Sequence, residues 1–213
     1  MSVVPGKRTE DKTHQLVQDC KARTADRLMN RMTSDEYAPY KTAIFEAYAV
    51  AQEQPRTGRP GRPKKPRKVL PAGLKYATVP EERENGRVVK VTTRVVFGTV
   101  AAVLLAVAAS LVSKVVNTCF VERHTGTDRN RNRRKVRKTY CFSKDWDVHA
   151  AMTCFTMYSY NFCWPVRTLR VKWDERQYWE RTPAMAVGLT DHVWKLREWL
   201  CFPAITAQDA RQR

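Results

Sequence analysis

Acidic residues are scarce in this sequence. Asp and Glu together number 21 against 39 Lys and Arg, which gives a formal net charge of +18 at pH 7. An imbalance of this size is uncommon in enzymes that act on small neutral substrates, and it indicates a polyanionic partner. We expect nucleic acid first and an anionic membrane surface second, and we expect no small-molecule substrate.

The sequence also lacks the residue pairs that hold structural metals, and it has no internal repeat. Its cysteines form no CxxC pair, and its four histidines form no close pair on a turn, which argues against a structural zinc site. Because no signal peptide precedes the cysteines, we expect reduced, mostly buried thiols in a cytosolic protein. These cysteines are Cys20, Cys119, Cys141, Cys154, Cys163 and Cys201.

The N-terminal segment alternates between strand and helix patterns. Residues 2–4 have the pattern of a short strand, and Thr9 is a candidate N-cap for the helix that follows. Residues 27–33 are predicted to form a strand that ends just before Asp35, and residues 36–50 to form a second helix. This alternation predicts an α/β fold.

A linker and a hairpin follow. Residues 52–72 contain five prolines and two glycines, which predicts an extended linker without helix or central strand. Beyond it, the apolar runs at 74–79 and 87–97 flank a polar turn around 81–86 and predict a hairpin.

Residues 95–113 carry no charge, and 19 such residues approach the roughly 20 that cross a bilayer. Gly98 and Thr99 break this run into a strand and a helical stretch of about 11 residues, the length of a buried core helix. The run is also built mainly from Ala and Val and has no aromatic residue at its boundaries. We therefore favour a buried helix, with a single membrane span over 95–116 as the alternative.

The C-terminal third is rich in aromatic residues. The stretch from Trp146 is predicted to form a helix that is packed on the core and ends at Pro165. Thr182 is predicted to cap a short helix that ends at Gly188, and a last amphipathic helix is predicted around Trp194 and Leu200. The apolar face of the first of these helices consists of Trp146, Met152, Phe155, Tyr158 and Phe162.

Two acids stand out because of their neighbours. Asp35 lies between a predicted strand and a predicted helix, and Glu122 precedes a basic run that ends at Lys144. Asp35 as a helix cap and Glu122 as a first-turn acid are ordinary explanations. Carboxylates are also the ligands of Mg²⁺ in enzymes that transfer phosphoryl groups of DNA, and basic side chains beside them bind phosphates.

Several segments together resemble a known family. TSDEYAPYKTAI, NTCFVERHTGTDRNRNRRKVRKTYCFSKDWDVH, YSYNFCWPVRTL and TPAMAVGLTDHVW occur in this order. They resemble the second half of the DDE transposases of bacterial insertion sequences, of the insertion-sequence-one type. The resemblance covers most of the chain, and the ordered combination of FVER, RKTYCFSK and TPAMA is specific.

The resemblance implies a ribonuclease H-like core in which three carboxylates hold two Mg²⁺ or Mn²⁺ ions that cut and rejoin DNA. Asp35 matches the second acid of the family and Glu122 the third, with 87 residues from one to the other. The first acid has no counterpart, because residues 2–12 resemble the remnant of the third strand. We therefore expect an incomplete core, the C-terminal part of a truncated transposase that is inactive or very weak alone.

The resemblance also implies an organisation and a set of partners. The expected parts are a partial core at 1–51, an inserted basic linker and hairpin at 52–94, the rest of the core at 95–168 and a helical extension at 169–213. The expected partners are DNA and further copies of this chain or of a full-length transposase. The expected location is the bacterial cytoplasm, in association with the nucleoid. A non-catalytic DNA-binding protein is the alternative function.

Two basic stretches are candidate DNA contacts. Arg59 and Arg62 lie in Gly-Arg-Pro units that resemble an AT-hook in the minor groove, and a solvated linker that binds phosphates without preference is the alternative. Lys64, Lys65, Arg67 and Lys68 are expected on flanking phosphates. The second stretch, from Arg123 to Lys144, is expected to guide DNA toward Glu122, and a merely solvated charged face is the alternative. Tyr140 and Trp146 are expected in the core rather than stacked on bases. The candidate residues of this stretch are Arg123, Arg129, Arg131, Arg133, Arg134, Lys135, Arg137 and Lys138.

Overall fold

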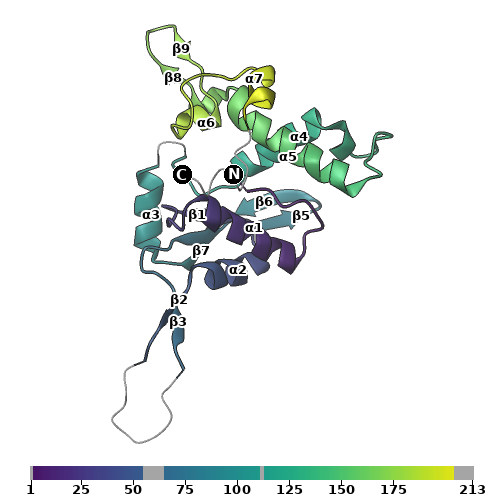
Figure 1. The fold of residues 1–213 in the computed structure, drawn as a ribbon. Coiled ribbons are helices and arrows are strands. Elements are labelled where there is room, and N and C mark those ends of the chain that lie inside the picture. The colour runs from purple at the N-terminus through teal and green to yellow at the C-terminus, as the bar shows by residue number, and fades with distance from the viewer. Residues whose placement is uncertain (1, 55–64, 111–112, 204–213) are drawn as a thin grey trace, which may run out of the picture. The chain divides into compact units, whose positions relative to one another are not determined.

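The computed structural model describes residues 2–54, 65–110 and 113–203 (Figure 1). The chain is mixed α/β and divides into two compact units, Met1–Thr125 and Gly126–Arg213. The first unit contains a sheet with helices and two strand ribbons, and the second consists mainly of helices.

A three-stranded sheet forms the centre of the first unit. Its strands are β1 (Met32–Ser34), β4 (Tyr76–Thr78) and β7 (Arg94–Phe97), in the spatial order β1-β4-β7. β1 and β4 are parallel, and α2 (Pro39–Tyr48) lies between them in the chain, so they form a β-α-β unit. β7 pairs antiparallel with β4.

Helices cover both faces of this sheet. α1 (Glu10–Arg23) and α2 lie side by side on one face, where Val17 and Ile44 pack in one core cluster with Tyr76 (Figure 1). α3 (Val100–Ala108) packs Val103 against Ala77 in a second cluster. Neighbouring residues of a strand point to opposite faces, so β4 joins the two cores.

Local sequence patterns predicted the starts of two of these helices correctly. The Thr9 side chain accepts a hydrogen bond from the Lys12 backbone N–H at the start of α1, which confirms the predicted cap. Thr99 caps α3 in the same way, immediately after Gly98 at φ +87°. A Cβ at residue 98 would lie 2.9 Å from the Leu74 carbonyl oxygen, so the break between β7 and α3 requires glycine. In the described ranges, no helix combines the length and apolarity needed to cross a membrane.

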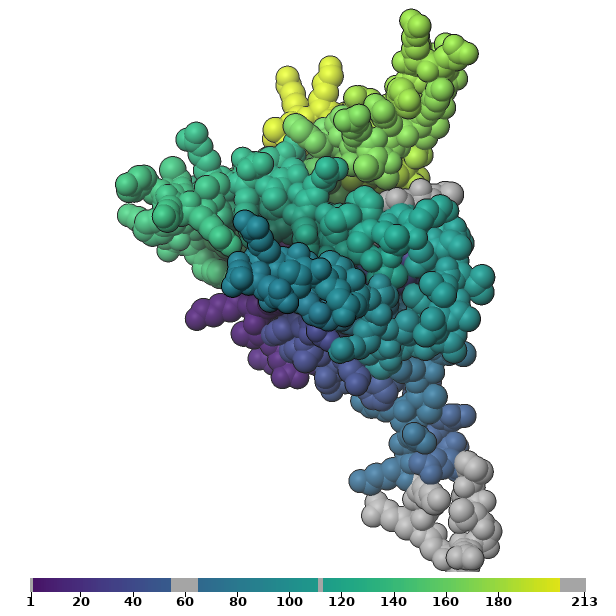
Figure 2. All heavy atoms as spheres, turned by 180° about the vertical axis from the view of Figure 1, so that it is seen from behind, coloured from purple at the N-terminus to yellow at the C-terminus, as the bar shows by residue number. Residues whose placement is uncertain are grey.

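Two antiparallel ribbons extend from the first unit. β2 (Val50–Gln52) pairs with β3 (Arg67–Val69), and this narrow ribbon, coloured blue, projects from the unit in Figure 2. β5 (Glu81–Glu84) pairs with β6 (Arg87–Val91) through a turn in which Asn85 and Gly86 have positive φ.

The ribbons and the N-terminal residues bear on three expectations from the sequence. The predicted linker has no helix or central strand among its described residues, but it contains β3, which is exposed and pairs on one side only, as an edge strand beside prolines can. Most of the predicted turn at 81–86 is strand, because residues 81–84 form β5 and pair with β6. The chain reverses over residues 85 and 86 alone, as a tight hairpin turn can. Residues 2–4 form no strand.

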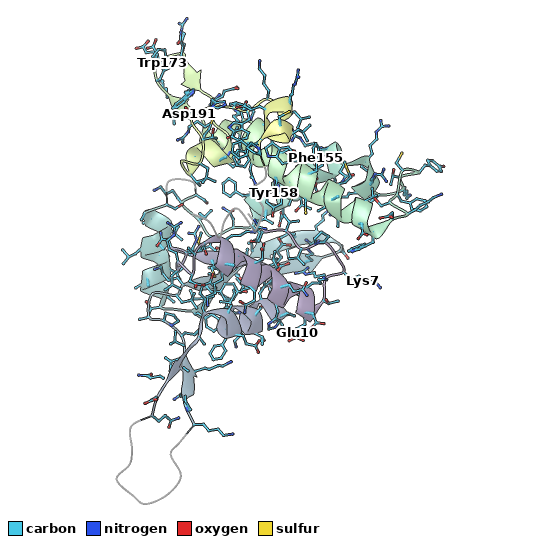
Figure 3. All side chains as sticks on the ribbon, in the orientation of Figure 1. Lys7, Glu10, Phe155, Tyr158, Trp173 and Asp191 are labelled. Carbon is cyan, nitrogen blue, oxygen red and sulfur yellow. The ribbon has the colours of Figure 1, made fainter. Side chains whose placement is uncertain are left out.

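The second unit is built from short elements around one long helix. α4 (Cys119–Arg131) leads into it from the first unit. The elements that follow are η1 (Arg133–Lys135), α5 (Trp146–Cys163), η2 (Arg167–Leu169), β8 (Val171–Lys172), β9 (Tyr178–Trp179), α6 (Pro183–Ala186) and α7 (Leu196–Cys201). β8 and β9 form a two-stranded hairpin with Trp173 near its tip (Figure 3).

The buried face of α5 is polar, contrary to the prediction of an aromatic face. Thr153, Thr156 and Ser159 are its buried residues, and their spacing of three places them on one side of the helix. Two aromatic residues of the predicted face, Phe155 and Phe162, contact the C-terminal segment instead. Phe155 packs edge-on against Trp199 of α7, with ring centroids 5.4 Å apart.

The C-terminal elements match the sequence in part. Thr182 caps α6 as predicted, and Gly188 with φ +75° follows it. α7 begins only at Leu196, so Trp194, which was predicted to lie in this helix, precedes it and packs on Phe162 of α5. All six cysteines are free. The expectation of mostly buried thiols is wrong, because three are exposed and three are partly exposed.

Candidate acidic pocket and basic surfaces

Asp35 and Glu122 line one pocket of the first unit. The pocket has a volume of about 470 Å³ and is formed by α1, β1, α2, Tyr76 of β4 and the first turn of α4. Most of its lining is apolar, from residues such as Leu16, Met32 and Ile44. The fold thus brings together two acids that lie 87 residues apart in the sequence.

Asp35 follows β1 but does not cap α2. The N-cap of α2 is Ala38, which makes no side-chain capping hydrogen bond, so the helix-cap explanation for Asp35 is wrong. The Asp35 carboxylate is about half exposed and accepts a hydrogen bond at Oδ2 from Nη2 of Arg8. The Arg8 guanidinium lies 4.1 Å from the ring centroid of Tyr37, which fixes its position beside the carboxylate.

Glu122 lies in the first turn of α4 and is exposed. The Thr118 hydroxyl donates a hydrogen bond of 2.8 Å to its Oε1. A negative side chain in this turn also interacts favourably with the helix dipole, so the ordinary explanation for Glu122 applies in this structure. Each of these contacts engages one oxygen of the carboxylate, Oδ2 of Asp35 and Oε1 of Glu122.

Two tyrosines complete the polar lining near Asp35. The Ser34 hydroxyl donates to the Asp35 carbonyl oxygen, so the Tyr76 hydroxyl, 2.7 Å from Ser34 Oγ, must be the donor in that contact. Burial raises the pKa of both Tyr40 and Tyr76, and the negative charge of Asp35 raises both further. Both phenols are therefore neutral at pH 7, and the charged groups in the lining are the two carboxylates.

The carboxylates of Asp35 and Glu122 are oxygen donors of the type that a hard divalent cation takes. Mg²⁺ is commonly held by one or two carboxylates, with water and substrate phosphate in the remaining positions. Over the described ranges, no cluster of three or more His, Cys, Asp and Glu side chains is arranged to hold a metal ion.

The basic residues of the second unit divide into two groups. Lys135 donates to Oδ2 of the buried Asp128 over 2.6 Å, and the Arg131 guanidinium lies 3.6 Å from the ring centroid of Trp164. Burial lowers the pKa of Arg131, as expected for a side chain packed on aromatic rings. These two cations stabilise the unit. The exposed members of the predicted set in this unit are Arg129, Arg133, Arg134, Arg137 and Lys138.

The other predicted DNA contacts have different environments. Arg123 is exposed in α4 of the first unit. Lys65, Arg67 and Lys68 are exposed on or beside the β2–β3 ribbon. Three residues of the AT-hook-like segment, Arg59, Arg62 and Lys64, lie outside the described residues.

Two aromatic residues assigned to the core are on the surface. Tyr140 is fully exposed, and Trp146 is 57% exposed and stacks on His149. The assignment of both to the core is wrong, because aromatic character alone does not determine which face of a segment is covered.

Sequence reasoning missed a charged cluster near α7. Nδ1 of His192 lies 2.6 Å from Asp191 Oδ1, and Nε2 lies 2.8 Å from Glu198 Oε1. These two carboxylates raise the pKa of the imidazole, since both ring nitrogens must carry protons to donate to them. The sequence signal was the spacing of six residues from His192 to Glu198 across a turn.

Comparison of the chain with protein-family models, with curated proteins and with solved structures found no match. The function must therefore be inferred from the chemistry of the chain's own side chains.

Proposed function

We propose that this chain is a DNA-handling protein of the transposase type, in which Asp35 and Glu122 act on DNA phosphates with Mg²⁺ or Mn²⁺. The observation that carries the proposal is the shared pocket of these two acids, which the resemblance selected from the sequence alone. The parallel β1-α2-β4 unit, with helices on both faces of its sheet, supports a ribonuclease H-like core.

Each residue has a defined role in this proposal. Asp35 and Glu122 would bind the cation, which would neutralise phosphate charge and polarise a phosphorus–oxygen bond when bound. Arg8 holds the Asp35 carboxylate in place through Oδ2, and Thr118 holds Glu122 through Oε1. Because the resemblance supplies two acids where the family uses three, we expect strand cleavage by this chain alone to be slow or absent.

Nicking of a supercoiled plasmid in Mn²⁺ tests the catalytic part of the proposal. Slow nicking that is lost in both Asp35→Asn and Glu122→Gln, and retained in Glu53→Gln, would support it. Glu53 is an exposed acid of the same unit that does not line the pocket, so it is a matched control. Nicking that persists in both pocket variants would assign the activity to other residues or to a contaminant.

A second candidate is a DNA-binding protein without catalysis. It is favoured by the exposed cations of η1 and the following loop, which carry no acidic partner in the described contacts. Such a protein would bind duplex DNA with a strong salt dependence, because phosphate contacts release counterions. It would show no nicking, and Asp35→Asn and Glu122→Gln would leave its affinity unchanged. Failure to bind DNA even at low salt would contradict both candidates.

A further inference from the structure

A second cavity lies in the second unit, where η1 faces the segment that leads into α5. It has a volume of about 470 Å³, within the range of pockets that hold small ligands. Its lining combines guanidinium groups, one buried amide, and apolar side chains. The lining residues are Arg131, Asn132, Arg133, Arg134, Cys141, Phe142 and Met152.

Asn132 supplies an unused hydrogen-bond donor at this cavity. Its Oδ1 accepts from the Arg134 backbone N–H over 3.1 Å and caps η1, which fixes the orientation of the amide. Its Nδ2 is therefore the other end of the amide, and this atom is buried with no hydrogen-bond partner. Buried polar groups are almost always paired, so an unpaired amide N–H in a residue that lines a cavity favours a ligand that carries a hydrogen-bond acceptor.

The charged groups at the cavity suit a phosphate. Arg131 is held on Trp164, and Lys135, next to the cavity, is held by Asp128. Arg133 and Arg134 are exposed, and a guanidinium binds phosphate oxygens with two parallel hydrogen bonds. The cavity therefore offers two cations to an anionic ligand.

The apolar groups suit a planar ring. Phe142 is 59% exposed at the cavity, and Met152 lines it from α5. Tyr140, two residues before Phe142, is fully exposed. Exposed aromatic rings beside cations are the combination on which the bases of single strands stack, and an unpaired base presents both a face for stacking and an edge for hydrogen bonding.

We propose that this cavity binds one unpaired nucleotide of single-stranded DNA. The base stacks on Phe142, an acceptor on its edge pairs with Nδ2 of Asn132, and its phosphate meets Arg133 and Arg134. The inference rests on the proposed DNA-handling function and names its substrate as DNA with an unpaired segment.

Fluorescence anisotropy with three labelled probes tests this inference. The probes are a 12-mer of thymidine, a 12-mer of abasic sites with the same phosphates, and a blunt 12-base-pair duplex. Because stacking contributes about 1–3 kcal/mol per base, we expect the thymidine 12-mer to bind at least about fivefold more tightly than the abasic one. Equal affinity for these two single strands would overturn the inference.

Three variants locate the effect. Asn132→Asp keeps the oxygen that caps η1 and removes the N–H donor, and Phe142→Leu removes the ring but stays apolar. Each should remove most of the preference for thymidine over abasic sites. Phe120→Leu, at an exposed phenylalanine of the first unit, should leave it intact.

Two outcomes separate this inference from the function on which it rests. If both cavity variants still bind the duplex and still prefer the thymidine 12-mer over the abasic 12-mer as strongly as the unsubstituted protein does, the nucleotide site is overturned and DNA binding stays in place. Absence of binding to all three probes at low salt would overturn the DNA-handling function itself. Because Phe142 is exposed, Phe142→Leu keeps the test decisive if Asn132→Asp disturbs folding.

Discussion

The pair formed by Asp128 and Lys135 should control the stability of the second unit. Lys135 Nζ lies 2.6 Å from Asp128 Oδ2, and the side chains are only 17% and 9% exposed. The Thr156 hydroxyl lies 2.7 Å from the other oxygen, Oδ1, and links the pair to the buried face of α5. This network connects α4, η1 and α5, and thereby positions the lining of the nucleotide cavity.

The costs of removing the two members should not add. Asp128→Ala leaves the Lys135 ammonium largely buried without its carboxylate, and breaking a buried pair in this way costs about 3–5 kcal/mol. Because the ammonium still reaches some solvent, we expect the lower end, about 3 kcal/mol. Lys135→Met should cost a similar amount. The double variant should cost less than the sum by about 2 kcal/mol, since neither uncompensated charge remains.

Urea unfolding followed by tryptophan fluorescence measures these costs selectively. All six tryptophans lie between Trp146 and Trp199, so their emission reports the second unit. Glu180→Ala, at an exposed acid of the same unit, should change the free energy of unfolding by less than about 0.5 kcal/mol. Additive effects of the two pair substitutions would refute the coupling, and losses below about 1 kcal/mol would show that the pair is solvated.

Three further predictions address backbone, pH and charge. Gly98→Ala forces a left-handed backbone and a clash with a carbonyl oxygen and should destabilise the first unit by at least about 1 kcal/mol. Gly126→Ala, at a helical position with open space around it, should stabilise the protein by about 0.5–1 kcal/mol. Thermal circular dichroism measures the effects of both glycine substitutions. The pKa of His192 is raised by its two carboxylates, so its stabilisation is complete below the ordinary imidazole pKa of about 6.5 and is lost as pH rises through the raised folded pKa. Urea unfolding across that range should lose this pH dependence in His192→Gln, and an unchanged profile would refute the assignment. Replacing Arg133 and Arg134 together by Gln should lower the slope of log affinity for duplex DNA against log salt by about 1–2, and an unchanged slope would show that neither meets a phosphate.

Local capping chemistry made several helix starts predictable. Thr9, Thr99 and Thr182 each accept a hydrogen bond from the backbone of the first helical turn, and this interaction depends only on residues three positions apart. The break at Gly98 was predictable for the same reason, because a positive φ favours glycine wherever the chain turns sharply.

The packing of the second unit was not predictable from periodicity. Its long helix α5 has aromatic residues at helical spacing, yet its buried residues are polar, and one of them, Thr156, donates a hydrogen bond to Asp128. A hydrogen-bonded polar interface of this kind leaves no hydrophobic signal in the sequence. Tyr140 was misplaced for a related reason, since burial is decided by partners distant in the chain.

The candidate site was predictable in part. Asp35 and Glu122 were selected by the family resemblance, and the structure brings them to one pocket that no local pattern could reveal. The arginine run was evident from composition, but its division into structural and exposed cations depends on Asp128 and Trp164. Asn132 had a recognisable signal, an Asn directly before a helical turn, although its unpaired amide could be found only in three dimensions.

Binding of Mn²⁺ to the full chain in the presence of a short DNA duplex tests the central claim most directly. The free ion is measured by electron paramagnetic resonance in the unsubstituted protein and in Asp35→Asn, Glu122→Gln and the control Glu53→Gln. If the two acids share one cation, each pocket substitution weakens Mn²⁺ binding at least about fivefold, as expected when one of two carboxylate ligands is lost, and Glu53→Gln does not. Equal Mn²⁺ affinity in all four proteins would contradict the claim that Asp35 and Glu122 form a metal-binding pocket.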